Sequence, residues 1–192
     1  MNFKTATLAG LAAMLMAGSA MAVDVKLGVL NDRSGIYADL SGEGSVVAAR
    51  MAIEDFDAAA KGINVEVISA DHQNKPDVAS TIARQWYDEE GVDVIVDVPT
   101  SSAALAVNEI TREKGKIFLN SGAASTDLTG AQCAPGTAHW TYDTYALANG
   151  TGKAMVDNGY QNWYFLTADY AFGHSLEENT AAVVEASGGS VV

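Results

Sequence analysis

The sequence predicts an α/β protein built on a doubly wound parallel sheet, with a second domain of similar design beginning near its end. Short apolar runs rich in β-branched residues alternate with longer segments of helical periodicity, and a polar turn follows each predicted strand. This alternation stops at a long loop and then starts again. Successive strand–helix units favour parallel pairing with right-handed crossovers, which places helices on both faces of the sheet.

The first two strand–helix units are the simplest to assign. Residues 25–30 form an apolar run suited to a strand buried on both faces, and residues 63–69 alternate as a second strand. A helix is predicted over residues 42–60, where apolar side chains recur at helical spacing. Another runs from Pro76, a favourable first residue, to Gly91, a favourable end.

The third and fourth strands, residues 92–98 and 116–119, flank a helix over residues 102–113, and a hydroxyl-rich turn follows each strand. The carboxyl ends of parallel strands meet at one edge of a sheet, so we expect the two turns to lie side by side where such sheets bind ligands. A helix N-terminus favours an anion, and small residues let a backbone approach a ligand. An N-cap and an ordinary turn would use the same residue types. The predicted contacts to a small carboxylate are Ser101, Ser102, Gly122, Ala123, Ala124 and Ser125.

A loop over residues 126–140 interrupts this pattern. The pattern resumes with a helix to Asn158, a strand over residues 163–167 and a helix over residues 172–186, and a fresh series of this kind predicts a second domain. The last residues form a turn that leads toward another strand, so we expect the sequence to be part of a longer chain. The predicted divisions are residues 1–22, 23–140 and 141–192.

The N-terminus carries the signs of export. Lys4 precedes a short apolar core, and residues 19–22 have the small-x-small pattern of a cleaved secretory signal. The apolar core is too short to span a membrane, so a retained membrane anchor is the weaker interpretation. We therefore expect a mature chain that begins near Val23 in an exported compartment and is not embedded in the membrane.

Charge and cysteine content exclude several classes of function. The chain has 24 Asp and Glu against 11 Lys and Arg, a net charge of −13 at pH 7. Such a chain repels phosphate backbones and anionic membrane surfaces, which excludes nucleic acid as a partner. Cys133 is the only cysteine, so an intramolecular disulfide and a cysteine metal site are both excluded.

Short motifs at the strand ends form a set that points to one family. They are residues 25–29 with 34–35, 70–71 with 76–77, 100–102, 121–124, 127–129 and 168–173. Together they resemble the exported substrate-binding proteins of ABC transporters, which have the type I periplasmic-binding-protein fold. The resemblance is to the branch that binds leucine, isoleucine and valine, and it extends from residue 23 to the end.

The resemblance implies two lobes that close on a small ligand in the periplasm and then dock on a membrane permease, with no cofactor. We expect a monomer. Ser101 would hold the ligand carboxylate together with the turn over residues 122–124. Many relatives carry Thr where this chain has Ala124 followed by Ser125, so one hydroxyl contact is displaced. Relatives often carry Tyr at the position of Phe172.

These departures extend the range of expected ligands from branched-chain amino acids to aromatic and other amphipathic acids. Aromatic rings near the expected cleft would suit an aromatic ligand by stacking. Among them, Trp140 and Tyr145 are better explained as core or hinge residues, whereas Tyr37 stays open. The predicted contacts from the second lobe are Tyr142, Tyr170 and Phe172.

Two other functions fit the sequence less well. A hydrolase would need a nucleophile with a nearby base, but the chain has neither G-x-S-x-G nor H-E-x-x-H, and His72, His139 and His174 stand alone in polar turns typical of solvated histidines. A ligand-sensing receptor domain would have the same fold as a transport protein. The sequence leaves that second alternative open.

Overall fold

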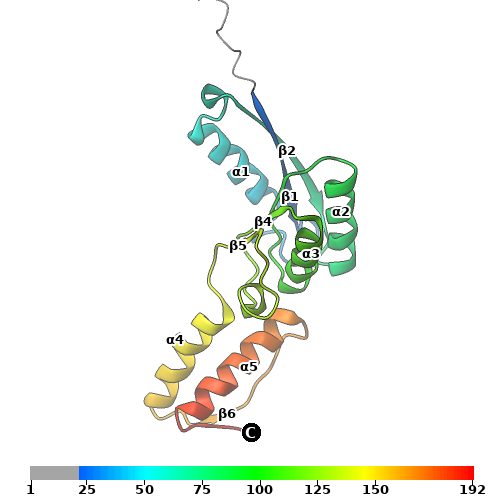
Figure 1. The fold of residues 1–192 in the computed structure, drawn as a ribbon. Coiled ribbons are helices and arrows are strands. Elements are labelled where there is room, and N and C mark those ends of the chain that lie inside the picture. The colour runs from blue at the N-terminus through cyan, green and yellow to red at the C-terminus, as the bar shows by residue number, and fades with distance from the viewer. Residues whose placement is uncertain (1–21) are drawn as a thin grey trace, which may run out of the picture.

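A five-stranded parallel sheet forms the first part of the computed structural model, which describes residues 22–192 (Figure 1). The predicted signal segment, apart from Ala22, lies outside these residues. The sheet order is β2-β1-β3-β4-β5, and every pairing is parallel. The strands are β1 (Val23–Asn31), β2 (Ile63–Asp71), β3 (Val94–Asp97), β4 (Ile117–Asn120) and β5 (Thr137–His139).

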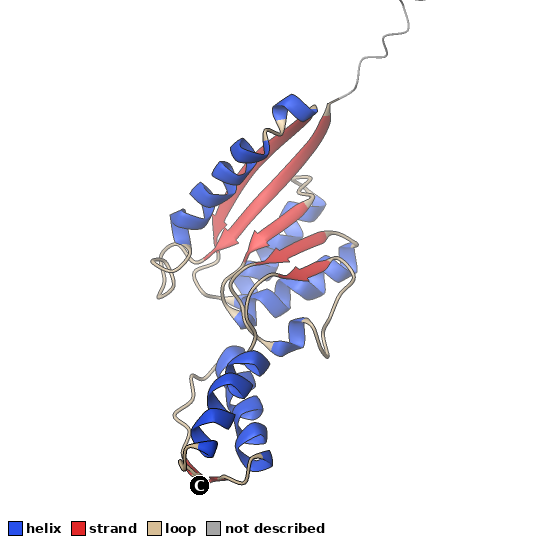
Figure 2. Cartoon of the chain, turned by 90° about the vertical axis from the view of Figure 1, so that its left-hand side faces the viewer, coloured by secondary structure: helices blue, strands red, loops and turns tan. Residues whose placement is uncertain are grey.

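Helices cover both faces of this sheet, which confirms the predicted α/β class. Helix α1 (Gly42–Phe56) lies on one face, and α2 (Pro76–Asp88) and α3 (Ser101–Lys114) lie together on the other (Figure 2). The main core is on the α2 and α3 side, where Leu30, Ile95 and Phe118 from three neighbouring strands are fully buried. Helix α1 is less covered, since only Gly42 and Val46 are buried.

Two elements of the first part differ from the sequence prediction. The helix predicted over residues 42–60 ends at Phe56, because Asp57 adopts a left-handed backbone and its N–H bonds back to the helix; a 3-10 turn, η1 (Ala59–Lys61), follows. The predicted loop over residues 126–140 contains a second such turn, η2 (Thr126–Leu128), and the short edge strand β5. The loop prediction is therefore wrong at β5.

The second part of the described chain is a pair of helices, α4 (Thr144–Asp157) and α5 (Ala171–Ala186), that pack along each other (Figure 1). Strands β6 (Asn162–Trp163) and β7 (Ser190–Val191) pair in parallel beside them. The strand predicted over residues 163–167 is thus shorter than expected, because β7 supplies partners for only two residues. Within residues 22–192, no helix is both long enough and apolar enough to span a membrane.

Tyr87 should make the stability of the fold depend on pH in the alkaline range. Its hydroxyl lies 3.0 Å from both Thr111 Oγ1 and the carbonyl oxygen of Ile117, which ties α2 to α3 and β4. Burial raises the pKa of Tyr87 to about 12, although the hydrogen bond with Thr111 acts in the opposite direction. The unfolded chain therefore loses this proton at a lower pH than the folded chain.

We expect the contribution of Tyr87 to stability to be intact below pH 10 and to fall as the pH rises toward 12. The loss should be about 2 kcal/mol at pH 11.5 and approach about 3 kcal/mol above pH 12, since the pKa is raised by about two units and each unit corresponds to about 1.4 kcal/mol. Urea unfolding of the wild type and Tyr87→Phe between pH 8 and pH 11.5 measures it, because the difference between them cancels the other titrating groups. A difference independent of pH would contradict the prediction.

Candidate functional site

The first candidate turn connects β3 to α3. The strand ends at Asp97, Thr100 is the extended residue before the helix, and Ser101 is its first residue. Thr100 accepts the Ala104 N–H at 2.8 Å through its carbonyl oxygen, which starts the helix in the usual way. The Ser101 side chain is buried, with 1% of the residue exposed. Its hydroxyl therefore faces protein atoms rather than open solvent.

Those protein atoms belong to the second candidate turn, which follows β4. The backbone N–H groups of Ala124 and Ser125 donate to Ser101 Oγ at 3.3 and 3.2 Å. Gly122 sits against Pro99 so closely that a Cβ on it would lie 2.8 Å from Pro99 Cα. The structure thus brings the two turns side by side, as the topology predicts. It also joins the turns through Ser101, whereas the sequence suggests that the Ser101 hydroxyl and the backbone of the second turn face the ligand separately.

The second part of the chain reaches these turns at the start of α5, through Tyr170 and Ala171. The hydroxyl oxygens of Tyr37 and Tyr170 lie 2.7 Å apart, and the Ala171 N–H donates to Ser102 Oγ at 3.2 Å. Burial raises the pKa of Tyr170 above its usual range, and the hydrogen bond with Tyr37 adds to the effect. The Tyr170 hydroxyl therefore stays neutral at ordinary pH and can remain hydrogen-bonded to Tyr37.

The other predicted aromatic contacts lie in different surroundings. The Phe172 ring centre is 5.9 Å from that of Tyr170, and Phe172 also lines an apolar hollow of about 510 Å³ between α4 and α5. Tyr142 is 59% exposed, and it lies near enough to Tyr170 to contribute to the raised pKa of that hydroxyl. Trp140 and Tyr145 are 82% and 61% exposed, so an assignment of either to the core is wrong.

Sequence reasoning missed a cluster of hydroxyl groups that connects the second turn to α4 and α5. Thr144 Oγ1 lies 2.7 Å from Ser175 Oγ, and it accepts the Thr126 N–H at 3.3 Å. Asn179 Nδ2 donates to the Ser175 carbonyl oxygen at 2.7 Å and reaches Thr126 Oγ1 at 3.4 Å. These residues come from distant segments in which hydroxyl side chains are common, so no local pattern distinguishes them.

The three histidines occupy different positions, and one differs from expectation. His72 is completely buried rather than solvated, and burial lowers its pKa while Asp32, Asp71 and Asp97 act to raise it. Its Nδ1 accepts the Asn74 N–H at 3.0 Å. His139 Nε2 lies 2.6 Å from the Ala123 carbonyl oxygen, and the exposed His174 lies 3.1 Å from an Asp169 carboxylate oxygen.

None of these histidines is hydrogen-bonded to Ser101, and the described residues contain no cluster of His, Cys, Asp and Glu able to hold a metal ion. The two turns and the start of α5 meet at Ser101 and Ser102, and this junction offers a set of hydroxyl and backbone groups. These donors and acceptors suit reversible hydrogen bonding to a polar solute.

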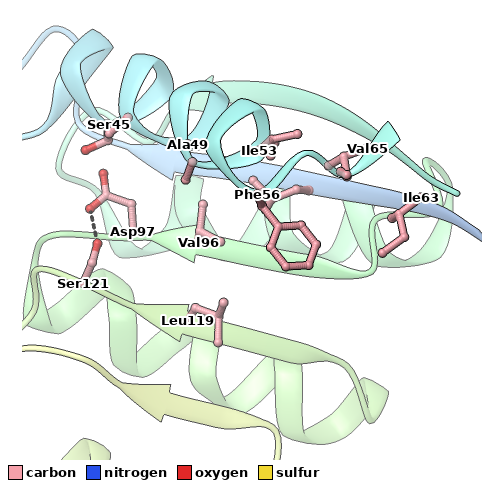
Figure 3. Close-up of a pocket in the computed structure, with 14 residues that line it drawn as sticks. Ser45, Ala49, Ile53, Phe56, Ile63, Val65, Val96, Asp97, Leu119 and Ser121 are labelled. Atoms are coloured by element: carbon pink, nitrogen blue, oxygen red, sulfur yellow. Dashed lines mark hydrogen bonds between the residues drawn. The ribbon is translucent and has the colours of Figure 1, made fainter. Parts of the chain in front are cut away.

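A second apolar hollow, of about 450 Å³, lies between α1 and the sheet (Figure 3). Its walls include Ile53 and Phe56 from α1 and Leu119 from β4, and one end is closed by Asp97 and Ser121, which are hydrogen-bonded to each other. Leu119 is 41% exposed, so this face of the sheet is less covered than the α2 and α3 face.

Comparison with known proteins places this arrangement in a family. The family model described as periplasmic binding protein matches residues 24–192. No curated protein matches the chain. A crystal structure of a periplasmic binding protein from Burkholderia mallei is 50% identical over 88% of this chain, with a TM-score of 0.84, and the match covers 45% of that protein.

Two further solved structures extend the comparison. A branched-chain amino acid ABC transporter periplasmic ligand-binding protein from Burkholderia xenovorans is 38% identical over 87% of this chain, with a TM-score of 0.75, and 45% of it is covered. An ABC transporter solute-binding protein from R. palustris, in complex with benzoate, is 25% identical over 88% of this chain, with a TM-score of 0.80 and 47% coverage.

In each case this chain spans less than half the length of the relative. The family model nevertheless covers nearly all of the described residues, and the sheet order, the two joined turns and the second pair of helices lie within that match. The chain therefore belongs to the periplasmic binding protein family.

Proposed function

We propose that this protein is the extracytoplasmic substrate-binding component of an ABC importer, and that it captures a small carboxylate between two lobes and delivers it to a membrane permease. The observation that carries the proposal is the junction at Ser101 and Ser102. There, two turns from neighbouring strands are joined by one hydroxyl, and the start of α5 reaches them through Ala171.

The geometry supports a specific role for Ser101. Its oxygen already accepts two backbone N–H groups, so its proton is the group that remains for donation to a ligand. A carboxylate oxygen is a strong acceptor for such a proton. Ser102 and residues 122–125 would complete the first side of the site. Tyr142, Tyr170 and Phe172 would cover the ligand from the second side.

The proposed ligand is an aromatic or branched-chain carboxylic acid. The relative from B. xenovorans is a branched-chain amino acid ABC transporter ligand-binding protein, and the relative from R. palustris binds benzoate in its crystal structure. Benzoate and a branched-chain amino acid share a carboxylate next to an apolar body. The tilted pair of Tyr170 and Phe172 favours an aromatic body, because aromatic rings pack well in offset or tilted arrangements.

The proposal includes export through the predicted signal over residues 1–22 and action as a monomer. The strongly acidic composition is compatible with a soluble carrier in an aqueous compartment. We further propose that the site binds its solute without converting it. Incubation with esters and amides of the acids that bind should leave them intact, and hydrolysis would contradict this part of the proposal.

A melting-temperature panel tests the function. We expect benzoate, 4-hydroxybenzoate or L-leucine to raise the melting temperature by about 5 to 10 °C at about 100 times Kd, because a ligand that binds only the folded state stabilises it. Benzamide and L-leucinamide are the matched controls, since they keep the apolar body and lack the carboxylate. Equal shifts with acid and amide, or no shift with any acid, would contradict carboxylate capture.

A further inference from the structure

Asp97 and Val98 form a left-handed bend, here called the elbow, between β3 and the first turn. Their φ angles are +78° and +52°, and both residues are buried. The other non-glycine residues with positive φ in the described chain are Asp57, Gln73 and Asn74, which lie outside the core. Valine is branched at Cβ and is strongly disfavoured in this backbone region, so the elbow is strained.

Hydrogen bonds from two neighbouring segments, β1 and the turn after β4, hold the elbow in this conformation. The Val98 N–H donates to the Leu30 carbonyl oxygen at 2.9 Å. One oxygen of the Asp97 carboxylate accepts a hydrogen bond from Asn31 Nδ2 at 3.1 Å. The other oxygen accepts one from Ser121 Oγ at 3.0 Å (Figure 3). Asn31 Nδ2 also donates to the Gly42 carbonyl oxygen at 2.6 Å. The carboxylate thus connects β1 to the turn after β4, and the Asn31 amide extends this connection to the start of α1.

This carboxylate is buried without a cationic partner. Asp97 is 5% exposed, and within residues 22–192 no Lys or Arg lies within ion-pair distance of it. Its two hydrogen bonds come from neutral side chains, although burying a carboxylate is costly. Strained backbone and a buried carboxyl group without a Lys or Arg partner therefore occur together, directly before the turn that begins at Pro99.

The elbow determines where that turn lies. After Val98 the chain continues through Pro99, against which Gly122 packs, to Ser101, which bonds the second turn. Ser121, the partner of Asp97, is the first residue of that second turn. We infer that Asp97 and Val98 are positioning residues of the ligand site, because their elbow holds both turns at the separation that the Ser101 hydrogen bonds require. The ligand-affinity part of this inference rests on the proposed function.

Val98→Gly and Val98→Ala are a matched pair that isolates the strain. Both substitutions remove the two methyl groups of the valine side chain, but only glycine adopts a positive φ without strain. We expect Val98→Gly to melt about 2 to 4 °C above Val98→Ala. We also expect the Ala124 and Ser125 amides to exchange hydrogen at least about tenfold faster in Val98→Gly, because glycine has access to many backbone conformations, so the elbow is no longer restricted to one and the turns can separate.

These two shifts have opposite signs, which separates positioning from a merely structural role. A residue that only stabilises the fold would change the melting temperature and the amide protection in the same direction. Equal melting temperatures of the two variants would show that the elbow is unstrained. Equal protection at Ala124 and Ser125 would show that the elbow does not position the turns. Either result would overturn the inference.

Asp97→Asn tests the carboxylate, with Asp93→Asn as its control. Asp93 accepts the Lys26 N–H at 2.9 Å near the amino end of β3, far along the strand from the turns. We expect Asp97→Asn to accelerate exchange at Ala124 and Ser125 at least about fivefold, and Asp93→Asn to leave it unchanged. Unchanged exchange in Asp97→Asn, or equal acceleration in both variants, would remove Asp97 from the positioning role.

The same variants have a binding readout for any acid that stabilises the wild type in the melting panel. Val98→Gly and Asp97→Asn should bind that acid at least about tenfold more weakly than Val98→Ala and Asp93→Asn. If no acid stabilises the wild type, the proposed function fails. The exchange measurements need no ligand, so they decide the positioning role in either case.

Discussion

Replacing Ser101 with alanine is expected to lower the free energy of unfolding by about 1 to 3 kcal/mol, since it leaves two buried N–H groups without an acceptor. These are the amides of Ala124 and Ser125, which donate to Ser101 Oγ. Because the variant also lacks the hydroxyl proton proposed to reach the ligand, carboxylate affinity should fall at least about tenfold. Urea unfolding and calorimetric titration measure the two effects.

Two serine variants serve as controls for Ser101→Ala. Ser80 Oγ donates to the Pro76 carbonyl oxygen on the exposed side of α2, so Ser80→Ala should change neither stability nor affinity appreciably. Ser102→Ala removes only the acceptor for the Ala171 N–H and should cost less stability than Ser101→Ala. Unchanged stability in Ser101→Ala would contradict the two hydrogen bonds, and unchanged affinity would remove Ser101 from the ligand contacts.

The features that the sequence predicts well are those encoded by local side-chain chemistry. Strand β3 begins with three consecutive apolar residues, as buried strands do, and Pro76 marks the first residue of α2. Parallel order and helices on both faces then follow from the alternation of strands and helices. The meeting of the two turns follows from the same topology, since both come after neighbouring strands.

Features made by backbone groups far apart in the chain were not predictable. Strand β5 has the sequence Thr-Ala-His, which has little strand character, and it forms because its backbone pairs with the edge of β4. Gly136, just before it, approaches the Lys116 carbonyl oxygen so closely that a Cβ would lie 2.1 Å away. The glycine looks like an ordinary loop residue until the strand beside it is known.

The burial of His72 has the same kind of cause. In the sequence it stands in a polar turn, which is typical of a solvated side chain. In the fold the His72 backbone N–H donates to the Asn31 carbonyl oxygen at 2.9 Å. This bond continues the β1 and β2 ladder past the end of the strand and places the imidazole ring inside the protein. The left-handed elbow at Asp97 escapes sequence reasoning too, because valine is a poor signal for positive φ.

Gly122→Ala is expected to separate the two turns by steric contact alone. Its Cβ would lie 2.8 Å from Pro99 Cα and 3.1 Å from Pro99 Cβ, distances at which backbone must move. The resulting overpacking should lower the free energy of unfolding by about 1 to 3 kcal/mol. Because the Ser101 hydrogen bonds to the second turn are already 3.2 and 3.3 Å long, a small displacement should break them and weaken carboxylate binding at least about tenfold.

Gly150→Ala is the matched control, because a Cβ at Gly150 in α4 meets no atom within 4 Å. Alanine is a better helix former than glycine, so this control should leave the protein equally stable or stabilise it by about 0.5 to 1 kcal/mol. Urea unfolding and titration with the acid that stabilises the wild type compare the two variants. If Gly122→Ala matched the control in both measurements, close contact between the turns would not be needed for the site. Loss of binding at nearly full stability would be the strongest evidence that the site needs this close contact.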